Sequence, residues 1–170
     1  MDFKQYIRDI PDFPKKGIIF KDITPLLKDK KAFHEAIDVF VRQYSDETIH
    51  KVVSVEARGF IFAGALAYRL NCGFVPIRKP GKLPADTISL DYTLEYGKNT
   101  VEIHKDALER GERVLVFDDL LASGGTVAAT CELIEKLGGE IIGCAFLIDL
   151  TFLQGRQKLQ PYSVFSLIEY

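Results

Sequence analysis

One stretch, V-L-V-F-D-D-L-L-A-S-G-G-T from Val114 to Thr126, constrains the fold of this chain more than any other. Its first four residues are apolar, which is typical of a strand buried in a parallel sheet. Two carboxylates, Asp118 and Asp119, follow directly, and a turn of small residues then leads into apolar residues at helical spacing. The stretch therefore predicts a strand, a glycine-rich turn and a helix, which is the repeating unit of α/β proteins.

The turn itself, A-S-G-G-T at 122–126, is typical of an anion site. Glycines let the backbone approach a phosphate and turn several N–H groups toward it. The helix N-terminus adds a partial positive charge, and Ser123 and Thr126 add hydroxyl donors. Asp118 and Asp119 would repel a phosphate, but they suit sugar hydroxyls or a divalent cation. A phosphorylated ribose would satisfy both halves of the motif, whereas the alternative is a helix-capping acid beside a solvated one.

The rest of the chain also alternates between strands and helices. Periodicity predicts these elements at 29–44 (helix), 52–55 (strand), 60–70 (helix), 74–77 (strand), 140–150 (strand) and 162–168 (strand). A short helix is expected over 2–10 and a hairpin over 91–104. This order predicts one α/β domain over residues 1–170, with a central, mainly parallel sheet flanked by helices. Ligands of such sheets bind beyond the carboxyl ends of the strands.

Composition narrows the classes of function. The 170 residues carry 22 Lys and Arg against 24 Asp and Glu, for a net charge of −2. This balance argues against a nucleic-acid-binding protein, because such proteins usually have a basic excess. No apolar run approaches the ~18 residues of a membrane span, and the N-terminus has no signal-peptide pattern. The three cysteines form no C-x-x-C pair, as is typical of reduced thiols. We therefore expect a cytoplasmic protein without nucleic-acid or membrane partners.

Further candidate residues follow other strands. Arg58, in E-A-R-G at 56–59, can donate two hydrogen bonds to a phosphate. The loop R-K-P-G-K at 78–82 gathers three cations, but it does not match the P-loop pattern, and the chain has no dinucleotide-binding glycine fingerprint. Either group could equally be solvated at the surface. Phe20 could stack on a planar base, or it could be a buried core residue.

Together these motifs resemble the type I phosphoribosyltransferase family, and within it the adenine-specific branch. The 114–126 stretch is similar to the family's signature for phosphoribosyl pyrophosphate. The segments that resemble the adenine branch are P-D-F-P-x-x-G (11–17), F-K-D-I-T-P (20–25), E-A-R-G-F (56–60), I-R-K-P-G-K-L-P (77–84) and L-E-Y-G (94–97). Ser123 and Lys21 stand where this family more often has threonine and arginine.

The resemblance implies the type I phosphoribosyltransferase fold, with a small hood formed by about residues 1–25 and the C-terminal segment, and a mobile loop at about 79–100. It implies a cytoplasmic homodimer in purine salvage that transfers the 5-phosphoribosyl group of phosphoribosyl pyrophosphate to adenine, giving AMP and pyrophosphate. It also implies Mg²⁺, held mainly by substrate and water rather than directly by the protein. Two alternatives stay open: transfer to another purine base, and a non-enzymatic regulator that senses phosphoribosyl pyrophosphate.

The resemblance also assigns roles by position. The catalytic residues would be Glu95, which handles a proton, Tyr96 and Arg58. The phosphoribosyl group would be bound by Asp118, Asp119, Ala122, Ser123, Gly124, Gly125 and Thr126. Pyrophosphate would be bound by Arg58, Arg78, Lys79 and Lys82. Adenine would be bound by Ile19, Phe20 and Lys21. Without the resemblance, a carboxylate such as Glu95 at a hairpin tip would be expected to be simply solvated.

Overall fold

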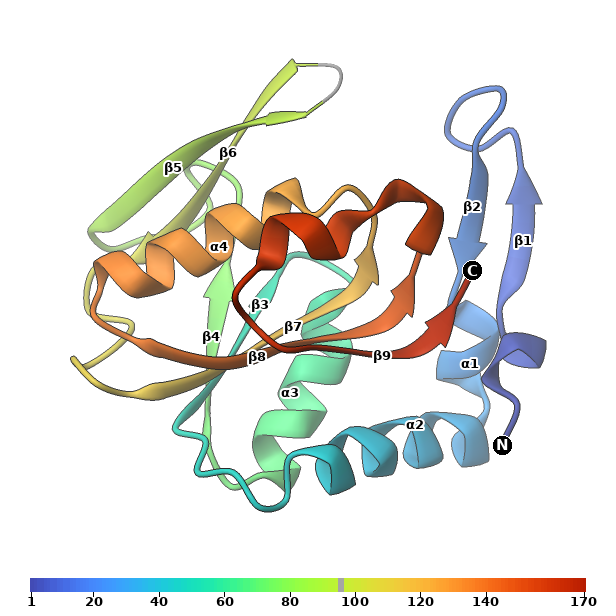
Figure 1. Cartoon of the computed structure of the whole chain (residues 1–170), viewed down its shortest axis with the longest axis horizontal. Helices are drawn as coiled ribbons and strands as arrows, with labels where there is room; N and C mark the ends of the chain where they lie inside the picture. Colours follow the sequence, from blue (N-terminus) through green and yellow to red (C-terminus); the bar gives the residue numbers. More distant parts are fainter. Residues whose placement is uncertain (95–96) are drawn as a thin grey trace.

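The computed structural model describes residues 1–94 and 97–170, so Glu95 and Tyr96 lie outside the described residues (Figure 1). A five-stranded sheet, with all its strands parallel, has the order β4-β3-β7-β8-β9. Its strands are β3 (Lys51–Val55), β4 (Gly73–Ile77), β7 (Arg113–Leu121), β8 (Glu140–Asp149) and β9 (Val164–Glu169). The predicted α/β fold with a mainly parallel central sheet is confirmed.

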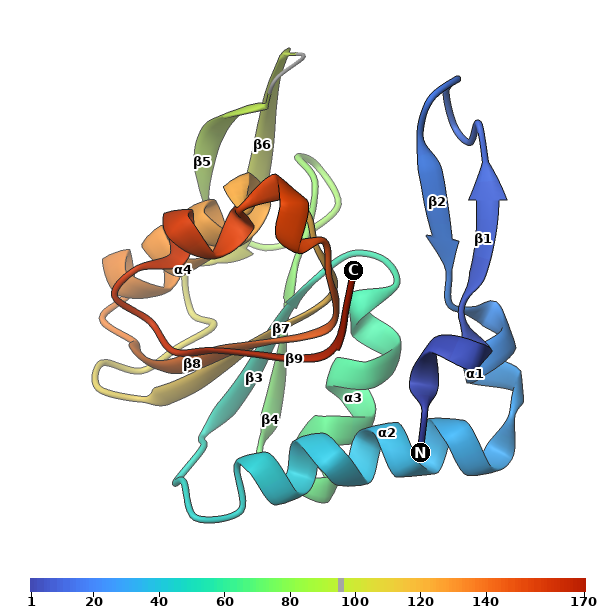
Figure 2. The same ribbon diagram turned by 45° about the vertical axis from the view of Figure 1, so that its right-hand side comes forward.

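Helices cover both faces of this sheet (Figures 1 and 2). The helices are α1 (Thr24–Lys28), α2 (Lys30–Gln43) and α3 (Gly59–Arg69) on one face and α4 (Gly125–Lys136) on the other. Alternate side chains of a strand point to opposite faces, and β7 supplies both cores. Leu115 and Phe117 pack on the α2–α3 side, while Val114 and Val116 pack on the α4 side. All four are fully buried, in agreement with the buried strand that the apolar run predicts.

A hairpin of β5 (Thr87–Leu94) and β6 (Gly97–His104) lies against α4 and projects beyond the sheet (Figure 1). It confirms the predicted hairpin and extends its first strand back to Thr87. Val101 and Ile103 of β6 are buried in the core on the α4 side, which anchors the base of the hairpin.

A second hairpin, β1 (Arg8–Pro11) with β2 (Ile19–Asp22), stands at the other end of the molecule (Figure 2). The helix predicted over 2–10 is wrong: a short 3₁₀ helix, η1, covers Phe3–Tyr6, and the chain is extended from Arg8. The cause is a tertiary contact, because the Arg8 guanidinium donates to the Asp22 carboxylate at 2.6 Å and ties the two strands together.

Two 3₁₀ helices, η2 (Thr151–Leu153) and η3 (Gly155–Leu159), connect β8 to β9. Leu159 of η3 belongs to the core on the α4 side, so this connection lies over the same face as α4. Within the described residues no helix combines the length and the apolarity that crossing a bilayer requires.

Candidate active site

Residues from several segments border one cavity of about 470 Å³. The segments are the turn after β3, the loop after β4, the β5–β6 hairpin, the end of β7 and the start of α4. The cavity brings together five residues that the sequence predicts as functional: Arg58, Lys79, Asp118, Asp119 and Thr126. It therefore lies at the carboxyl ends of the parallel strands, where ligands of such sheets are expected.

Asp118 and Asp119 form an acidic pair at the end of β7. Asp118 Oδ1 accepts a hydrogen bond from the Asp119 backbone N–H at 2.9 Å, and Asp119 is only 6% exposed. Burial and the neighbouring charge of Asp119 raise the pKa of Asp118 well above its usual value. Burial also raises the pKa of Asp119, although the Arg58 guanidinium opposes this increase. Carboxylates that have lost most of their water gain strongly from hydroxyl donors or a cation.

Gly59, the first residue of α3, lets this helix begin directly against the acidic pair. A Cβ at Gly59 would lie 2.5 Å from Ser54 Oγ and 2.7 Å from Asp118 Oδ1. Both distances are far below van der Waals contact, so any larger residue would displace the carboxylate. The glycine in E-A-R-G thus leaves the space that the Asp118 carboxylate occupies.

The turn at 122–126 contains a left-handed backbone conformation, which a glycine adopts without strain. Gly124 has φ +79° and immediately precedes α4. A Cβ at Gly124 would lie 2.5 Å from the carbonyl oxygen of Gly155, and a Cβ at Gly155 would lie 2.2 Å from that of Ala122. The turn and the start of η3 therefore interlock through two glycines. The neighbours of Gly155 in the sequence do not predict its role, because the carbonyl that it packs against belongs to Ala122, in a distant segment.

Tyr92 of β5 also reaches this region, and sequence reasoning missed it. The Thr126 hydroxyl donates to the Tyr92 hydroxyl at 3.0 Å, and both residues line the cavity. A tyrosine in one strand of a hairpin is ordinarily a packing residue, so its spacing alone does not mark it as functional.

Arg58 lies between the acidic pair and the β1–β2 hairpin. One guanidinium nitrogen lies 2.8 Å from Asp119 Oδ2, and another donates to the Lys21 carbonyl oxygen at 3.5 Å. The guanidinium carbon lies 4.7 Å from the centre of the Phe20 ring, within the range of a cation–π interaction. This one side chain therefore links the predicted ribose-binding acids to the predicted base-binding strand.

The predicted base-binding residues do not line the cavity. Phe20 packs edge-on against Phe13 and is connected to the cavity through Arg58. Ile19 is 55% exposed. The Lys21 ammonium is held elsewhere, 2.8 Å from Asp9 and 3.6 Å from the centre of the Tyr170 ring.

Two glutamates, Glu56 and Glu102, hold the basic loop at 78–82 through hydrogen bonds. Glu56 accepts hydrogen bonds from the Lys79 N–H at 2.7 Å and from the Arg78 guanidinium at 3.4 Å, and the first of these contributes most to lowering the pKa of Glu56. Glu102 accepts from the Gly81 N–H at 3.2 Å. Arg78 also donates to the Lys82 carbonyl at 3.2 Å. Lys79 lines the cavity, whereas Arg78 and Lys82 lie outside its lining.

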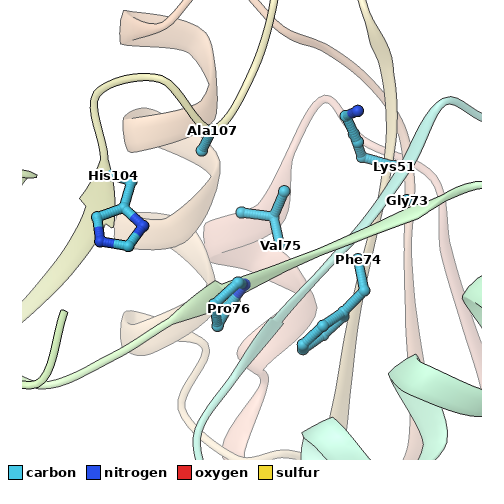
Figure 3. Close-up of a pocket in the computed structure, with 7 residues that line it drawn as sticks. All are labelled: Lys51, Gly73, Phe74, Val75, Pro76, His104 and Ala107. Atoms are coloured by element: carbon cyan, nitrogen blue, oxygen red, sulfur yellow. The ribbon is translucent and has the colours of Figure 1, made fainter. Parts of the chain in front are cut away.

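A smaller cavity of about 230 Å³ lies at the β4 edge of the sheet (Figure 3). His104 and Lys51 lie on either side of Val75 in this view. Both polar groups already have partners: His104 accepts a hydrogen bond from the Ala85 N–H at 3.3 Å, and Lys51 lies 3.2 Å from Glu112. We therefore assign the functional site to the larger cavity.

Comparisons with known proteins identify the family of the chain. The phosphoribosyl transferase domain family matches residues 26–169. The chain is 60% identical to the adenine phosphoribosyltransferase of Halothermothrix orenii over 99% of both chains, and 56% identical to that of Thermotoga neapolitana over 100% of both. The crystal structure of adenine phosphoribosyltransferase from Thermoanaerobacter pseudethanolicus superposes with a TM-score of 0.97 at 54% identity, covering 99% of this chain and 98% of that one. The chain belongs to the adenine phosphoribosyltransferase family.

Proposed function

We propose that the cavity at the strand ends is the active site of the family reaction. The chain transfers the 5-phosphoribosyl group of phosphoribosyl pyrophosphate to adenine, forming AMP and releasing pyrophosphate. The observation that carries the assignment to this cavity is the juxtaposition of an acidic pair, with Asp118 partly buried and Asp119 buried, and a glycine turn at a helix N-terminus. These two parts match the ribose hydroxyls and the 5′-phosphate of one ligand.

The phosphoribosyl group is assigned to the end of β7 and the turn that follows. The carboxylates of Asp118 and Asp119 accept hydrogen bonds from the ribose hydroxyls. The backbone N–H groups of residues 122–126, together with the hydroxyls of Ser123 and Thr126, hold the 5′-phosphate.

Pyrophosphate is assigned to the basic side of the cavity. Lys79 lines the cavity, and unlike Arg58 and Arg78 it forms no ion pair within the described part of the chain. Ribose hydroxyls that bind Asp119 would compete with Arg58 and release its guanidinium toward the leaving group. Lys82 and Arg78 complete the positive field around the departing oxygen.

The reaction needs charge stabilisation in two places. A nitrogen of the imidazole ring of adenine attacks the anomeric carbon as the bond to pyrophosphate breaks, so the sugar becomes oxocarbenium-like. The carboxylates beside the ribose stabilise the positive sugar, and the cations stabilise the leaving group. Glu95 and Tyr96 lie outside the described residues, and we propose that Glu95 handles the proton of the purine, a role typically worth about 10²–10⁴-fold in rate.

Mg²⁺ fits this site as an ion held mainly by the substrate. The described residues contain no group of three or more His, Cys, Asp or Glu side chains that could hold a metal. Mg²⁺ commonly keeps several waters and binds substrate phosphates with one or two carboxylates. Asp118 and Asp119 border the cavity and could contact such an ion through its water ligands. The ion would supply positive charge to the departing pyrophosphate.

The base is assigned to the β1–β2 hairpin. Phe20 offers a ring for stacking on adenine, and the backbone groups of Ile19 and Lys21 can read the edge of the base. We propose that residues 1–25 and the C-terminal segment form a hood over this position. The cation–π contact of Lys21 with Tyr170 supports the hood, because it joins the two segments. The mobility of the loop at 79–100 stays a prediction.

We propose that the working form is a homodimer in the cytoplasm. Ile61 and Tyr68 lie two turns apart on α3 and are exposed, Tyr68 by 86%, and Phe74 is exposed on the edge strand β4. An apolar patch beside an open sheet edge is suited to an interface. The three cysteines are free, as is usual in a reducing compartment. Light scattering should give twice the chain mass, and Tyr68→Glu should shift it toward the monomer.

The function is tested by a base-selection assay. The protein is incubated with phosphoribosyl pyrophosphate and Mg²⁺ and with adenine, hypoxanthine or guanine in turn, and the nucleotide is detected by mass. We expect AMP from adenine, with little product from the other bases. Product mainly from hypoxanthine or guanine would contradict the assignment to adenine. No product from any base would favour a regulator that only binds the donor.

A further inference from the structure

The Tyr92 hydroxyl connects the β5–β6 hairpin to the glycine turn. It lies 3.0 Å from Thr126 Oγ1, a residue 34 positions later in the sequence. None of the roles assigned above uses this contact.

Packing holds the Tyr92 side chain with its hydroxyl directed toward Thr126. Its ring packs against the core on the α4 side, and its strand partner at this position is Asn99. The hairpin residues Lys98 to Val101 line the same cavity as Tyr92 and Thr126. The hairpin therefore forms one wall of the cavity, and Tyr92 is its contact with the turn at 122–126.

The two hydroxyls leave one proton without a partner. Tyr92 and Thr126 each carry one O–H, and the hydrogen bond between them uses one of the two protons. Whichever hydroxyl donates, the other keeps its proton for a further acceptor. The described residues provide no other hydrogen-bond partner for the Tyr92 side chain, and both residues face the cavity. An anion in the 122–126 turn would be an acceptor in the right place.

We propose that Tyr92 is a positioning residue for the 5′-phosphate: with Thr126 it forms a two-hydroxyl relay that donates one hydrogen bond to a phosphate oxygen. The β5–β6 hairpin thereby becomes part of the phosphate pocket. The proposal rests on the proposed function, because it takes the 122–126 turn as the phosphate site. It adds that this site is built from two segments of the chain.

Tyr92→Phe tests the relay, because it removes the hydroxyl and keeps the ring. We expect the KM for phosphoribosyl pyrophosphate to rise about tenfold, the order expected for one hydrogen bond to a charged group. The kcat and the KM for adenine should change less than about twofold, because the phosphate is bound equally in the ground and transition states. AMP should inhibit the variant about tenfold more weakly, while inhibition by adenosine, which lacks the phosphate, should be unchanged.

Tyr162→Phe is the matched control. Its hydroxyl bonds to Glu135 near the other end of α4, so the variant also removes a tyrosine hydroxyl from that helix. Its KM values should equal those of the unmodified protein. An unchanged KM for the donor in Tyr92→Phe, or equal weakening of AMP and adenosine, would overturn the relay and leave Tyr92 as a packing residue.

Because the Thr126 hydroxyl is itself assigned to the phosphate, the second test is the coupling of Tyr92→Phe with Thr126→Val, which removes the other hydroxyl of the relay. Thr126→Val should also raise the KM for the donor, and the double variant should raise it little further than Thr126→Val alone. Full additivity of the two changes would overturn the relay, as would an unchanged KM in Thr126→Val. Failure of the proposed function looks different, because the unmodified protein would then form no AMP.

Discussion

The two halves of the site are built in different ways. The proposed ribosyl half, at 114–126, is the end of a strand buried on both faces, and its acids and glycine turn are held by close packing. The base half, on the β1–β2 hairpin, stands at the edge of the molecule, and Phe13, Ile18 and Ile19 there are each about half exposed. Its links to the rest include the contacts of Arg58 with Lys21 and Phe20 and that of Lys21 with the Tyr170 ring.

Taken with the proposed function, this difference predicts how the two substrates are recognised. The ribosyl half is organised before the ligand arrives, because the core that surrounds it is needed for folding itself. The base half has the room to adapt, since little core packing holds it in one position. Changes in the first half should therefore affect both activity and stability, and changes in the second should affect mainly the base.

The largest effect is expected from removing both charges of the ribosyl half. Asp118→Asn with Asp119→Asn should lower kcat/KM for phosphoribosyl pyrophosphate by about 10²-fold or more, since hydrogen bonds to charged groups contribute ~1.5–3 kcal/mol each. Steady-state kinetics with varied donor measures this effect. Asp106→Asn, at an exposed position outside the cavity, is the control. An unchanged specificity constant would refute the ribose role of the pair.

The next largest effect is a loss of stability, and two glycine variants separate the part due to steric crowding from the part due to backbone strain. Gly124 and Gly17 both have positive φ, but a Cβ at Gly124 meets the Gly155 carbonyl while a Cβ at Gly17 meets nothing within 4 Å. Gly17→Ala should cost only the backbone strain, about 1 kcal/mol, and Gly124→Ala should cost at least ~2–3 kcal/mol. Urea unfolding of both variants measures the difference. Equal losses in the free energy of unfolding would mean that the close packing of Gly124 against Gly155 does not contribute to stability.

A smaller effect is expected in the base half. Phe20→Leu removes the aromatic face and keeps an apolar side chain, so it should raise the KM for adenine about tenfold, in line with ~1–3 kcal/mol for stacking of a base. The KM for the donor should stay within about twofold. Phe13→Leu, on the neighbouring ring, is the matched control. A similar rise in both KM values would show that the two halves are not independent.

The smallest effect concerns stability and pH. The folded-state pKa of Asp118 is raised, so the folded protein binds this proton more tightly than the unfolded chain does, and stability falls as pH rises above the usual Asp pKa of ~3.9. Asp118→Asn removes this cost. The variant should melt a few degrees higher than the unmodified protein at pH 7, and the difference should shrink toward pH 4. A difference that grows as pH falls would contradict the raised pKa.

The strand and helix of the 114–136 segment are predicted correctly from local sequence signals. A four-residue apolar run, two acids and two glycines are local signals, and the strand and helix form where these signals place them. The β1–β2 hairpin was missed because its pairing depends on the ion pair between Arg8 and Asp22, fourteen positions apart. Tyr92 and Gly155 were missed because each acts only through a contact with the distant 122–126 segment.

The interlock of Gly124 with Gly155 has a consequence for protein engineering. A loop grafted from this chain onto another sheet would lack the opposing backbone that fills the space beside it. Exchanging the glycine turn between relatives therefore requires moving η3 together with it, as one transplantable unit. A library that varies residues 122, 123, 125 and 126 while holding residues 124 and 155 as glycine would sample far more folded proteins than one that varies all of these positions freely.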